Sequence, residues 1–359
     1  MAKPTIRALT RTCVAVGTAF ALLSVGSAAQ ADAHVAFRES DLVSDQPGHA
    51  TITDPDVVNA WGLALSPTSP LWVANNGSNT STLYAGGGAN PVTKVGLTVS
   101  IPGGAPTGQA FNGTSGFVVT GPNGSGPARF LFVSEDGDLT GWNPAADPTH
   151  AIVAKHVDGA VYKGLALWTN PFGSFLIATD FVGGHLDIFD SNFNKLTLPP
   201  NFFRDRALPK GYAPFNVLAI GDTVFVSYAK QQAGSADEQA GPGLGIVDKF
   251  TNLGQNADRV ASHGTLNAPW GLAVAPANFG QFAGDLLVGN FGDGRISAYR
   301  GRHFEGQLRD ARNKAIAIDG LWALLPGTAS TGGTGSLWFS AGPDDEQHGL
   351  VGLITPVTS

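Results

Sequence analysis

Short apolar segments separated by polar turns recur along most of the chain. A segment related to Trp-Gly-Leu-Ala is followed by a second apolar segment that ends in a polar turn, and this pair occurs six times. The six first segments are Trp61–Ala64, Ser115–Val119, Lys163–Ala166, Phe215–Leu218, Trp270–Ala273 and Gly320–Ala323. The six second segments are Leu71–Asn75, Phe130–Glu135, Phe175–Asp180, Val224–Tyr228, Leu286–Asn290 and Leu337–Ala341. Segments this short and apolar, bounded by turn residues, predict buried β-strands.

The repeat has a nearly constant length. When Gly62, Gly116, Gly164, Asn216, Gly271 and Leu321 are taken as equivalent, the spacings are 54, 48, 52, 55 and 50 residues. A period near 50 built from short strands is typical of propeller blades. The sequence therefore predicts an all-β fold, a six-bladed β-propeller with four-stranded blades, and a single domain over residues 34–359.

The two chain ends predict how the ring closes. The sixth copy ends in a third strand, Leu350–Ile354, and the chain stops before a fourth. An apolar N-terminal strand begins at Val35–Phe37. A ring is stable when no sheet edge is left open, so we expect the N-terminal strand to complete the last blade.

Composition favours the same fold. The 48 Gly and 23 Pro among 359 residues interrupt helices, and Glu, a good helix former, occurs only five times. The hydrophobic content of 43% is sufficient for a core. The composition excludes a helical bundle.

The first 33 residues have the order of a secretory signal peptide. Lys3, Arg7 and Arg11 precede an apolar run, and small residues follow, with cleavage expected after Ala31 or Ala33. We therefore expect a secreted, extracellular protein. Cleavage would remove Cys13, the only cysteine, and with it any disulfide or thiolate site.

The predicted mature chain is acidic. From His34 it carries 18 Lys and Arg against 27 Asp and Glu, a net charge of −9. This balance disfavours nucleic acid and anionic membranes as partners and suits cations such as calcium. We expect a monomer.

Several phrases resemble a known family. Asn59–Ala64, Leu71–Gly77 and Asn267–Ala273 resemble an uncharacterised family of secreted bacterial proteins related in pattern to NHL-type six-bladed propellers. The resemblance implies the fold but little chemistry, because propellers host lactonases, lyases, receptors and scaffolds. The chain is similar to six-bladed lactonase-like hydrolases, which hold a calcium ion in the channel with Glu, Asn and Asp side chains. That similarity implies Glu135, Asp180, Asn75 and Asn290 as ligands of a Ca²⁺ ion.

One residue per blade follows or ends the second segment, where loops meet at one mouth of the channel. These exit residues are Asn75, Glu135, Asp180, Tyr228, Asn290 and Ala341. Carboxylate and amide oxygens are the ligands that calcium prefers. The alternative is that these residues only begin hairpin turns, a role that Asp, Asn and Glu often have.

Other residues are candidates for ligand binding at the same mouth. Lys163 replaces the aromatic residue of other blades, and Lys163 and Tyr228 each offer a polar group that could bind a ligand. The alternative for Lys163 is that its ammonium group only extends into solvent. Trp61 and Trp270 either stack on a sugar or belong to the core. In the Asp344–His348 loop, Asp344 and His348 either hold a cation or lie on a solvated surface.

Three functions remain open. The first is an exported propeller that binds a small ligand, glycan or peptide at the channel mouth. The second is a calcium-dependent lactone or ester hydrolase in which Asp180 or Glu135 orients or deprotonates water. The third is a matrix or surface scaffold. The absence of G-x-S-x-G and G-x-x-x-x-G-K motifs argues against serine hydrolases and kinases.

Overall fold

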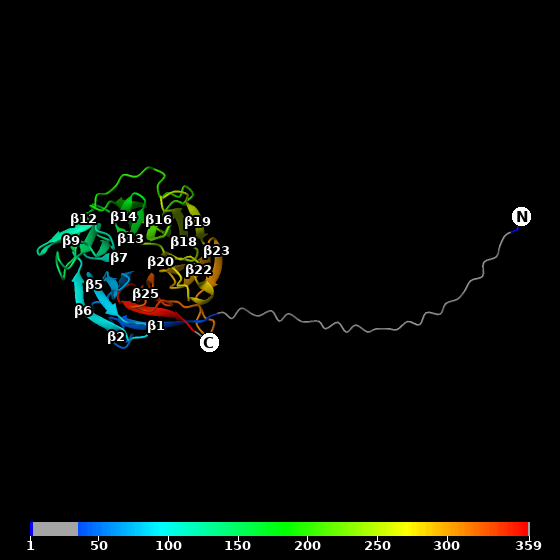
Figure 1. The fold of residues 1–359 in the computed structure, drawn as a ribbon, viewed down its shortest axis with the longest axis horizontal. Coiled ribbons are helices and arrows are strands. Elements are labelled where there is room, and N and C mark those ends of the chain that lie inside the picture. The colour runs from blue at the N-terminus through cyan, green and yellow to red at the C-terminus, as the bar shows by residue number, and fades with distance from the viewer. Residues whose placement is uncertain (3–34, 358–359) are drawn as a thin grey trace. The chain divides into compact units, whose positions relative to one another are not determined.

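Six sheets are arranged around a central axis in the computed structural model (Figure 1). The structure describes residues 1–2 and 35–357, so the predicted signal peptide, apart from Met1 and Ala2, and Cys13 lie outside the described residues. The described part contains strands and one 3-10 turn, η1 (Gly280–Phe282), with no α-helix. The predicted all-β, six-bladed propeller is confirmed. No described helix is long and apolar enough to cross a membrane.

The innermost strand of each blade lies nearest the axis, and neighbouring strands of a blade are antiparallel except for the parallel pair β1 and β2 in blade 6. Blade 1 contains β3 (Ala60–Ala64), β4 (Leu71–Asn75), β5 (Thr80–Ala85) and β6 (Thr93–Ser100). Blade 2 contains β7 (Pro106–Phe111), β10 (Phe130–Ser134), β11 (Asp138–Trp142) and β12 (Ile152–His156). Blade 3 contains β13 (Tyr162–Asn170), β14 (Gly173–Asp180) and β15 (His185–Phe189).

The second half of the ring follows the same order. Blade 4 contains β16 (Tyr212–Ile220), β17 (Thr223–Lys230), β18 (Gly245–Thr251) and β19 (Asp258–Ser262). Blade 5 contains β20 (Pro269–Val274), β21 (Leu286–Asn290), β22 (Ile296–Arg300) and β23 (His303–Gln307). Blade 6 contains β24 (Leu321–Pro326), β25 (Leu337–Ala341), β26 (Leu350–Pro356), β1 (Phe37–Ser44) and the short β2 (Ile52–Thr53).

The N-terminal strand closes the ring as predicted. Strand β1 pairs antiparallel with β26 from Phe37 opposite Pro356 to Ser44 opposite Leu350. The Phe37 ring is buried against Phe279 and Phe282, with ring centroids 4.8 and 5.8 Å away. The first and last parts of the domain therefore share one sheet.

We expect Phe37→Ala to lower the free energy of unfolding by about 3 kcal/mol, because it removes a fully buried aromatic side chain. Urea unfolding followed by fluorescence measures the change. Phe304→Ala is the matched control, since Phe304 is exposed and should lose little. Equal losses in the two variants would show that β1 does not stabilise the ring.

The predicted first strand of blade 2 is wrong. The innermost strand is β7, in which Gln109 lies opposite Phe132, whereas Ser115–Val119 lies outside it. Val118 instead begins an added hairpin of β8 (Val118–Gly121) and β9 (Gly124–Pro127). The signal was missed because β7 begins Pro-Thr-Gly-Gln and lacks the aromatic residue that marks most other copies.

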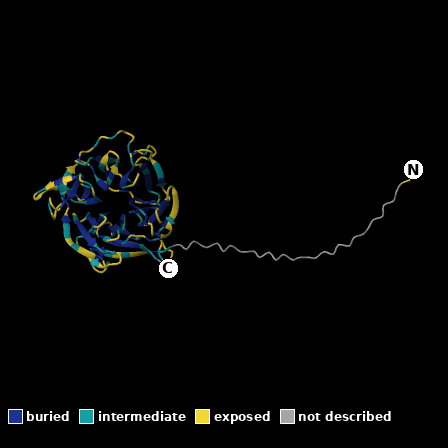
Figure 2. Cartoon of the chain, viewed as in Figure 1, coloured by how far each residue is buried: buried dark blue, intermediate teal, exposed yellow. Residues whose placement is uncertain are grey.

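Blade 3 departs from the four-stranded pattern. Its sheet has three strands, and only an isolated bridge between Phe189 and Lys195 occupies the place of a fourth. The chain then runs through residues 196–211 without a strand before β16 begins. In the described part of the chain, the buried residues follow the strands and the exposed ones follow the connecting loops (Figure 2).

Candidate ligand site at the channel mouth

One side chain from the innermost strand of each blade packs across the channel. Strand register makes these residues equivalent, because each lies in the bulge between the first two pairings of its strand. They are Trp61, Thr107, Lys163, Phe215, Trp270 and Trp322, and all six are buried. Trp61 stacks on Trp322 with ring centroids 3.6 Å apart, and Trp270 meets both rings edge-on. We call these six residues the channel plug.

Lys163 is the one charged member of the plug. Only 2% of its side chain is exposed, and its Nζ lies 2.5 Å from Glu135 Oε1 and 5.1 Å from the centre of the Trp61 ring. Burial favours the neutral amine, but the charges of Glu135, Glu238 and Asp237 outweigh burial and raise the pKa of Lys163. Lys163 is therefore a buried ammonium ion held by acids and does not reach into solvent.

Glu135 occupies a different register from the one that the sequence indicated. Strand pairing places Ser134 opposite Pro106, as Asn75 lies opposite Ala60, so Ser134 is the exit residue of blade 2. Glu135 is the residue after the exit position, and its equivalents are Asn76 in blade 1 and Phe181 in blade 3. In each of these blades the backbone amide of this residue donates to the carbonyl oxygen that precedes the innermost strand. A one-residue shift turns a side chain to the other face of a strand.

The other predicted calcium ligands are bonded within their own blades. Asn75 Nδ2 donates to the hydroxyls of Thr80 and Thr82. Asp180 Oδ1 accepts from the amides of Val161 and Gly183, and Asn290 Nδ2 donates to the Thr265 carbonyl oxygen. Among the described residues none of the three shares a hydrogen bond or ion pair with Glu135. This arrangement does not fit one ion held by all four, and calcium binding stays a prediction.

A hydrogen-bonded network covers the plug. Asn59 Nδ2 donates to Glu346 Oε2 at 2.6 Å and to Asn76 Oδ1 at 3.3 Å, and Asn59 Oδ1 accepts from Trp322 Nε1 at 2.9 Å. Asn76 Nδ2 in turn donates to Glu135 Oε2 at 3.0 Å. Residues from blades 1, 2 and 6 are thus connected over the channel to Lys163 of blade 3.

Glu346 reaches this network from a strained turn. Asp344, Asp345 and Glu346 have φ values of 58°, 53° and 65°, a left-handed turn that costs roughly 1–2 kcal/mol per residue. Strain of this kind persists where the surrounding contacts impose it, and it is concentrated at functional sites. The contact that this turn makes over the channel is the hydrogen bond from Asn59 to Glu346.

The two loop residues predicted as ligands lie elsewhere. Asp344 is exposed, and His348 Nδ1 lies 2.8 Å from Asp45 Oδ2 near the N-terminus of the domain. Trp61 and Trp270 are buried in the plug, and Trp270 Nε1 donates to the Lys163 carbonyl oxygen. Neither indole therefore offers an open face for a sugar.

Glu238 is the most unusual residue of the mouth. It lies in the loop between β17 and β18, where the residues from Gln232 to Ala240 are otherwise exposed, yet only 9% of Glu238 is exposed. Burial raises the pKa of Glu238 to about 7, with Lys163 opposing and Glu346 adding to the shift. Its carboxylate has no hydrogen bond or ion pair with another described residue. An acid held this way has a desolvation cost that no neighbour offsets fully.

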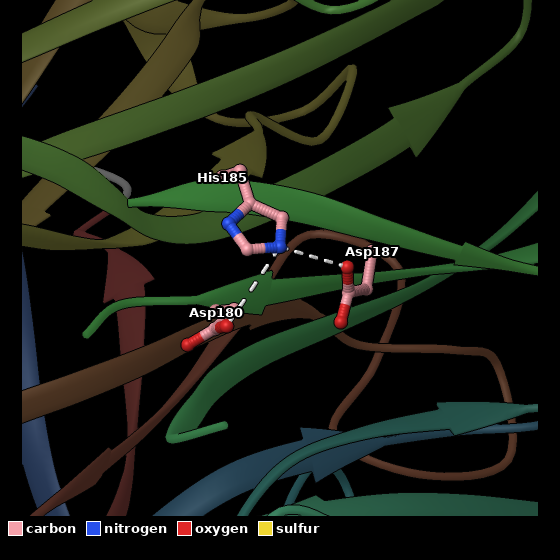
Figure 3. A group of neighbouring side chains, drawn as sticks. All are labelled: Asp180, His185 and Asp187. Carbon is pink, nitrogen blue, oxygen red and sulfur yellow. Dashed lines mark ion pairs between the residues drawn. The ribbon is translucent and has the colours of Figure 1, made fainter. Parts of the chain in front are cut away.

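A second cluster has spacing compatible with a metal site. Ligand atoms of Asp180, His185 and Asp187 lie within 4.8 Å of one another (Figure 3). The hydrogen bond to Asp187 raises the pKa of His185 to about 9, so at neutral pH both ring nitrogens carry protons, directed at Asp187 and the Gly183 carbonyl oxygen. Asp187 also accepts from Tyr162 and Lys195. In this state the cluster is an ion-pair network, and a metal ion would bind here only by displacing a proton from His185.

Sequence reasoning missed Asn76 and Glu238. Glu346 belongs to the Asp344–His348 loop that the sequence indicates, and Asn59 is one of the first-strand residues that the similarity to lactonase-like hydrolases offers as a further ligand. One signal was available, because three of the five glutamates of the chain gather at this mouth from three different blades: Glu135, Glu238 and Glu346. Tyr228, predicted at the mouth, lines a pocket between blades 3 and 4 instead.

Comparison with known proteins identifies relatives of the whole domain. "Uncharacterized protein L690" of Acanthamoeba polyphaga mimivirus is 34% identical over 330 residues, which cover 87% of this chain and 84% of that protein. "Uncharacterized protein R648" of the same virus is 33% identical over 324 residues, covering 87% and 78%. The chain belongs to the family of these proteins. They are viral, so they do not support the bacterial origin implied by the resemblance, and export stays a prediction.

Two other comparisons concern domain models and solved structures. No protein-family model matches the chain. A streptogramin B lyase structure aligns with 89% of this chain and 97% of its own at 12% identity and a TM-score of 0.47. A putative gluconolactonase aligns with 69% and 80% at 18% identity and a TM-score of 0.39. The fold assignment rests on strand order, and these likenesses carry no conclusion about chemistry.

Proposed function

We propose that the protein is a ligand-binding propeller that recognises a cationic group at the channel mouth. The observation that carries the proposal is the buried carboxylate of Glu238, which lies near Glu346 and Lys163 and has no hydrogen bond or ion pair with another residue of the described chain. A buried acid of this kind gains most from a positively charged ligand, because the ligand supplies the missing counter-charge.

The charge balance of the mouth supports the same ligand class. Glu135, Asp237, Glu238 and Glu346 face a single buried cation, Lys163. Glu135 already pairs with Lys163, which leaves Glu238 and Glu346 without a cationic partner. Their pKa values are raised, chiefly by burial, so in the free protein they take up protons readily. Divalent metal ions and organic ammonium ions both carry the positive charge that would compensate these two acids.

Calorimetric titration with calcium chloride and, separately, with diaminobutane shows which of the two classes of cation the protein binds. We expect one of these probes to bind. Glu238→Gln should weaken the binding of the active probe roughly tenfold, since it removes one charge from the site. Binding should also strengthen from pH 6 to pH 8: the Glu238 pKa of about 7 means that the acid is mostly protonated at pH 6, and a cation must displace that proton.

The matched control is Glu305→Gln, which makes the same substitution on an exposed strand of blade 5. Equal affinities for the Glu238→Gln and Glu305→Gln variants would contradict the proposed site. Binding of calcium alone would favour the metal-dependent hypothesis and call for a panel of lactones and esters. Binding of neither probe would overturn the proposal and favour a scaffold.

A further inference from the structure

A second cavity lies between blades 3 and 4, away from the channel mouth. It has a volume of about 640 Å³ and is bounded by β15, the segment 195–211 that replaces a fourth strand in blade 3, and the first strands of blade 4. Small-molecule sites in proteins have volumes of roughly 300–1,000 Å³. The missing strand therefore leaves a space of the size that a small ligand needs.

Apolar and aromatic side chains form one part of the wall of this inter-blade pocket, and polar groups form the rest. Leu196, Leu198, Phe202, Leu208 and Tyr212 line it, together with several prolines of the 195–211 segment. Phe203, which is buried, packs edge-on against Trp168 and Phe250 and so fixes the segment to both blades. The pocket is thus formed by a segment that is held in place and offers an apolar surface.

The charges around the pocket are opposite to those of the chain as a whole. Its lining contains four cations, with His185 protonated, against two carboxylates, in a chain whose net charge is −7. The cations are His185, Lys195, Arg204 and Lys210, and the carboxylates are Asp187 and Asp205.

Both carboxylates already have a cationic partner. Asp187 accepts from Lys195 at 2.7 Å and from His185 at 3.0 Å, and Asp205 pairs with Arg259, which also holds the neighbouring Asp248. Arg204 and Lys210 have no acidic partner among the described residues. The pocket rim therefore has a surplus of positive charge.

Tyr228 adds a buried hydrogen-bonding group. Only 4% of Tyr228 is exposed, its ring belongs to the core between the two blades, and it lines the pocket. Its hydroxyl makes no hydrogen bond with any described residue. Because Tyr228 lines the pocket, this hydroxyl is accessible to a hydrogen-bonding group of a ligand there.

We propose that the inter-blade pocket binds a small organic anion with an apolar body and one further hydrogen-bonding group, such as a substituted aryl carboxylate or sulfonate. The apolar body packs on the leucine and phenylalanine side chains, the anionic group faces Arg204 and Lys210, and the hydrogen-bonding group meets the Tyr228 hydroxyl. This site is separate from the cation site of the proposed function and does not depend on it.

Anilinonaphthalene sulfonate is a suitable probe, because it combines an aromatic body, one anion and one N–H group. We expect its fluorescence to rise saturably with one equivalent of protein. The double variant Arg204→Glu with Lys210→Glu should weaken binding roughly tenfold or more, since two attractive charges become repulsive. Tyr228→Phe should weaken it about threefold through the loss of one hydrogen bond.

Three controls keep this experiment decisive. Arg129→Glu reverses an exposed charge in blade 2 and should leave probe affinity unchanged. Phenylnaphthylamine, which lacks the sulfonate, should be insensitive to the double variant. Thermal melting confirms that each variant is folded. No saturable binding by the wild-type protein, or the same affinity for the double variant and Arg129→Glu, would overturn the proposal.

Discussion

Replacing Lys163 by methionine should destabilise the protein by about 3 kcal/mol at pH 8. The substitution keeps the length and apolar stem of the side chain but removes the ammonium ion that holds Glu135 and lies beside Glu238. Removing one partner of a buried ion pair leaves the other charge without compensation, which typically costs 3–5 kcal/mol. We place the effect at the lower end, because Glu135 is partly exposed. Urea unfolding measures it.

The pH dependence of the Lys163→Met variant tests the cause. Glu238 and Glu346 lose a neighbouring cation, so their folded-state pKa values, which burial already raises, rise further above the unfolded values. A raised acid pKa makes stability fall as pH increases toward that folded pKa, and lowering the pH restores it. The loss should therefore be smaller at pH 5 than at pH 8.

Two variants complete the test of the Lys163 charge. Lys155→Met, on the exposed strand β12, should change stability little at either pH. Adding Glu135→Gln to Lys163→Met should recover part of the loss, because the uncompensated acid is removed as well. A loss independent of pH, or no recovery in the double variant, would assign the effect to packing.

The fold was predictable because the repeat is periodic and its strands are buried. Glycine at the positions of Gly62, Gly164 and Gly271 recurs where the innermost strands approach a neighbouring strand, and a Cβ on Gly62 would lie only 2.3 Å from the Thr107 carbonyl oxygen. Blade 2 was the exception. Its glycine, Gly108, is present, but no aromatic residue precedes it, so the pattern favours the later apolar segment Ser115–Val119 as the strand.

The site was predictable only in part, because it depends on register and on loops. The sequence indicates Glu135 and Lys163 as site residues, and the structure pairs them. Glu135 nevertheless lies one residue beyond the exit position of blade 2, which Ser134 occupies. Glu238 and Glu346 reach the mouth from loops whose course no periodicity specifies. The left-handed turn that delivers Glu346 contains three non-glycine residues, which local preference disfavours. Such contacts arise from the assembled ring.

Replacing Trp322 by alanine should cost about 4 kcal/mol, a large part of the 5–15 kcal/mol that typically stabilises a folded protein. Trp322 is fully buried and stacks on Trp61 and Phe291, with ring centroids 3.6 and 4.0 Å away. Its Nε1 also donates to Asn59, so the variant would leave Asn59 Oδ1 without that donor. Urea unfolding measures the loss, and near-ultraviolet circular dichroism reports the loss of the stacked indole pair.

The mouth should be affected along with the plug, because Asn59 connects Trp322 to Glu346. Trp322→Phe keeps an aromatic ring but removes the N–H group, so it should retain most of the stability while weakening the binding of a cationic probe. Phe172→Ala, where 81% of the side chain is exposed, is the control for aromatic loss without burial. If Trp322→Ala is no less stable than Phe172→Ala, the plug does not support the ring. If Trp322→Phe binds the probe as the wild type does, the polar network over the channel does not depend on the hydrogen bond from Trp322 to Asn59.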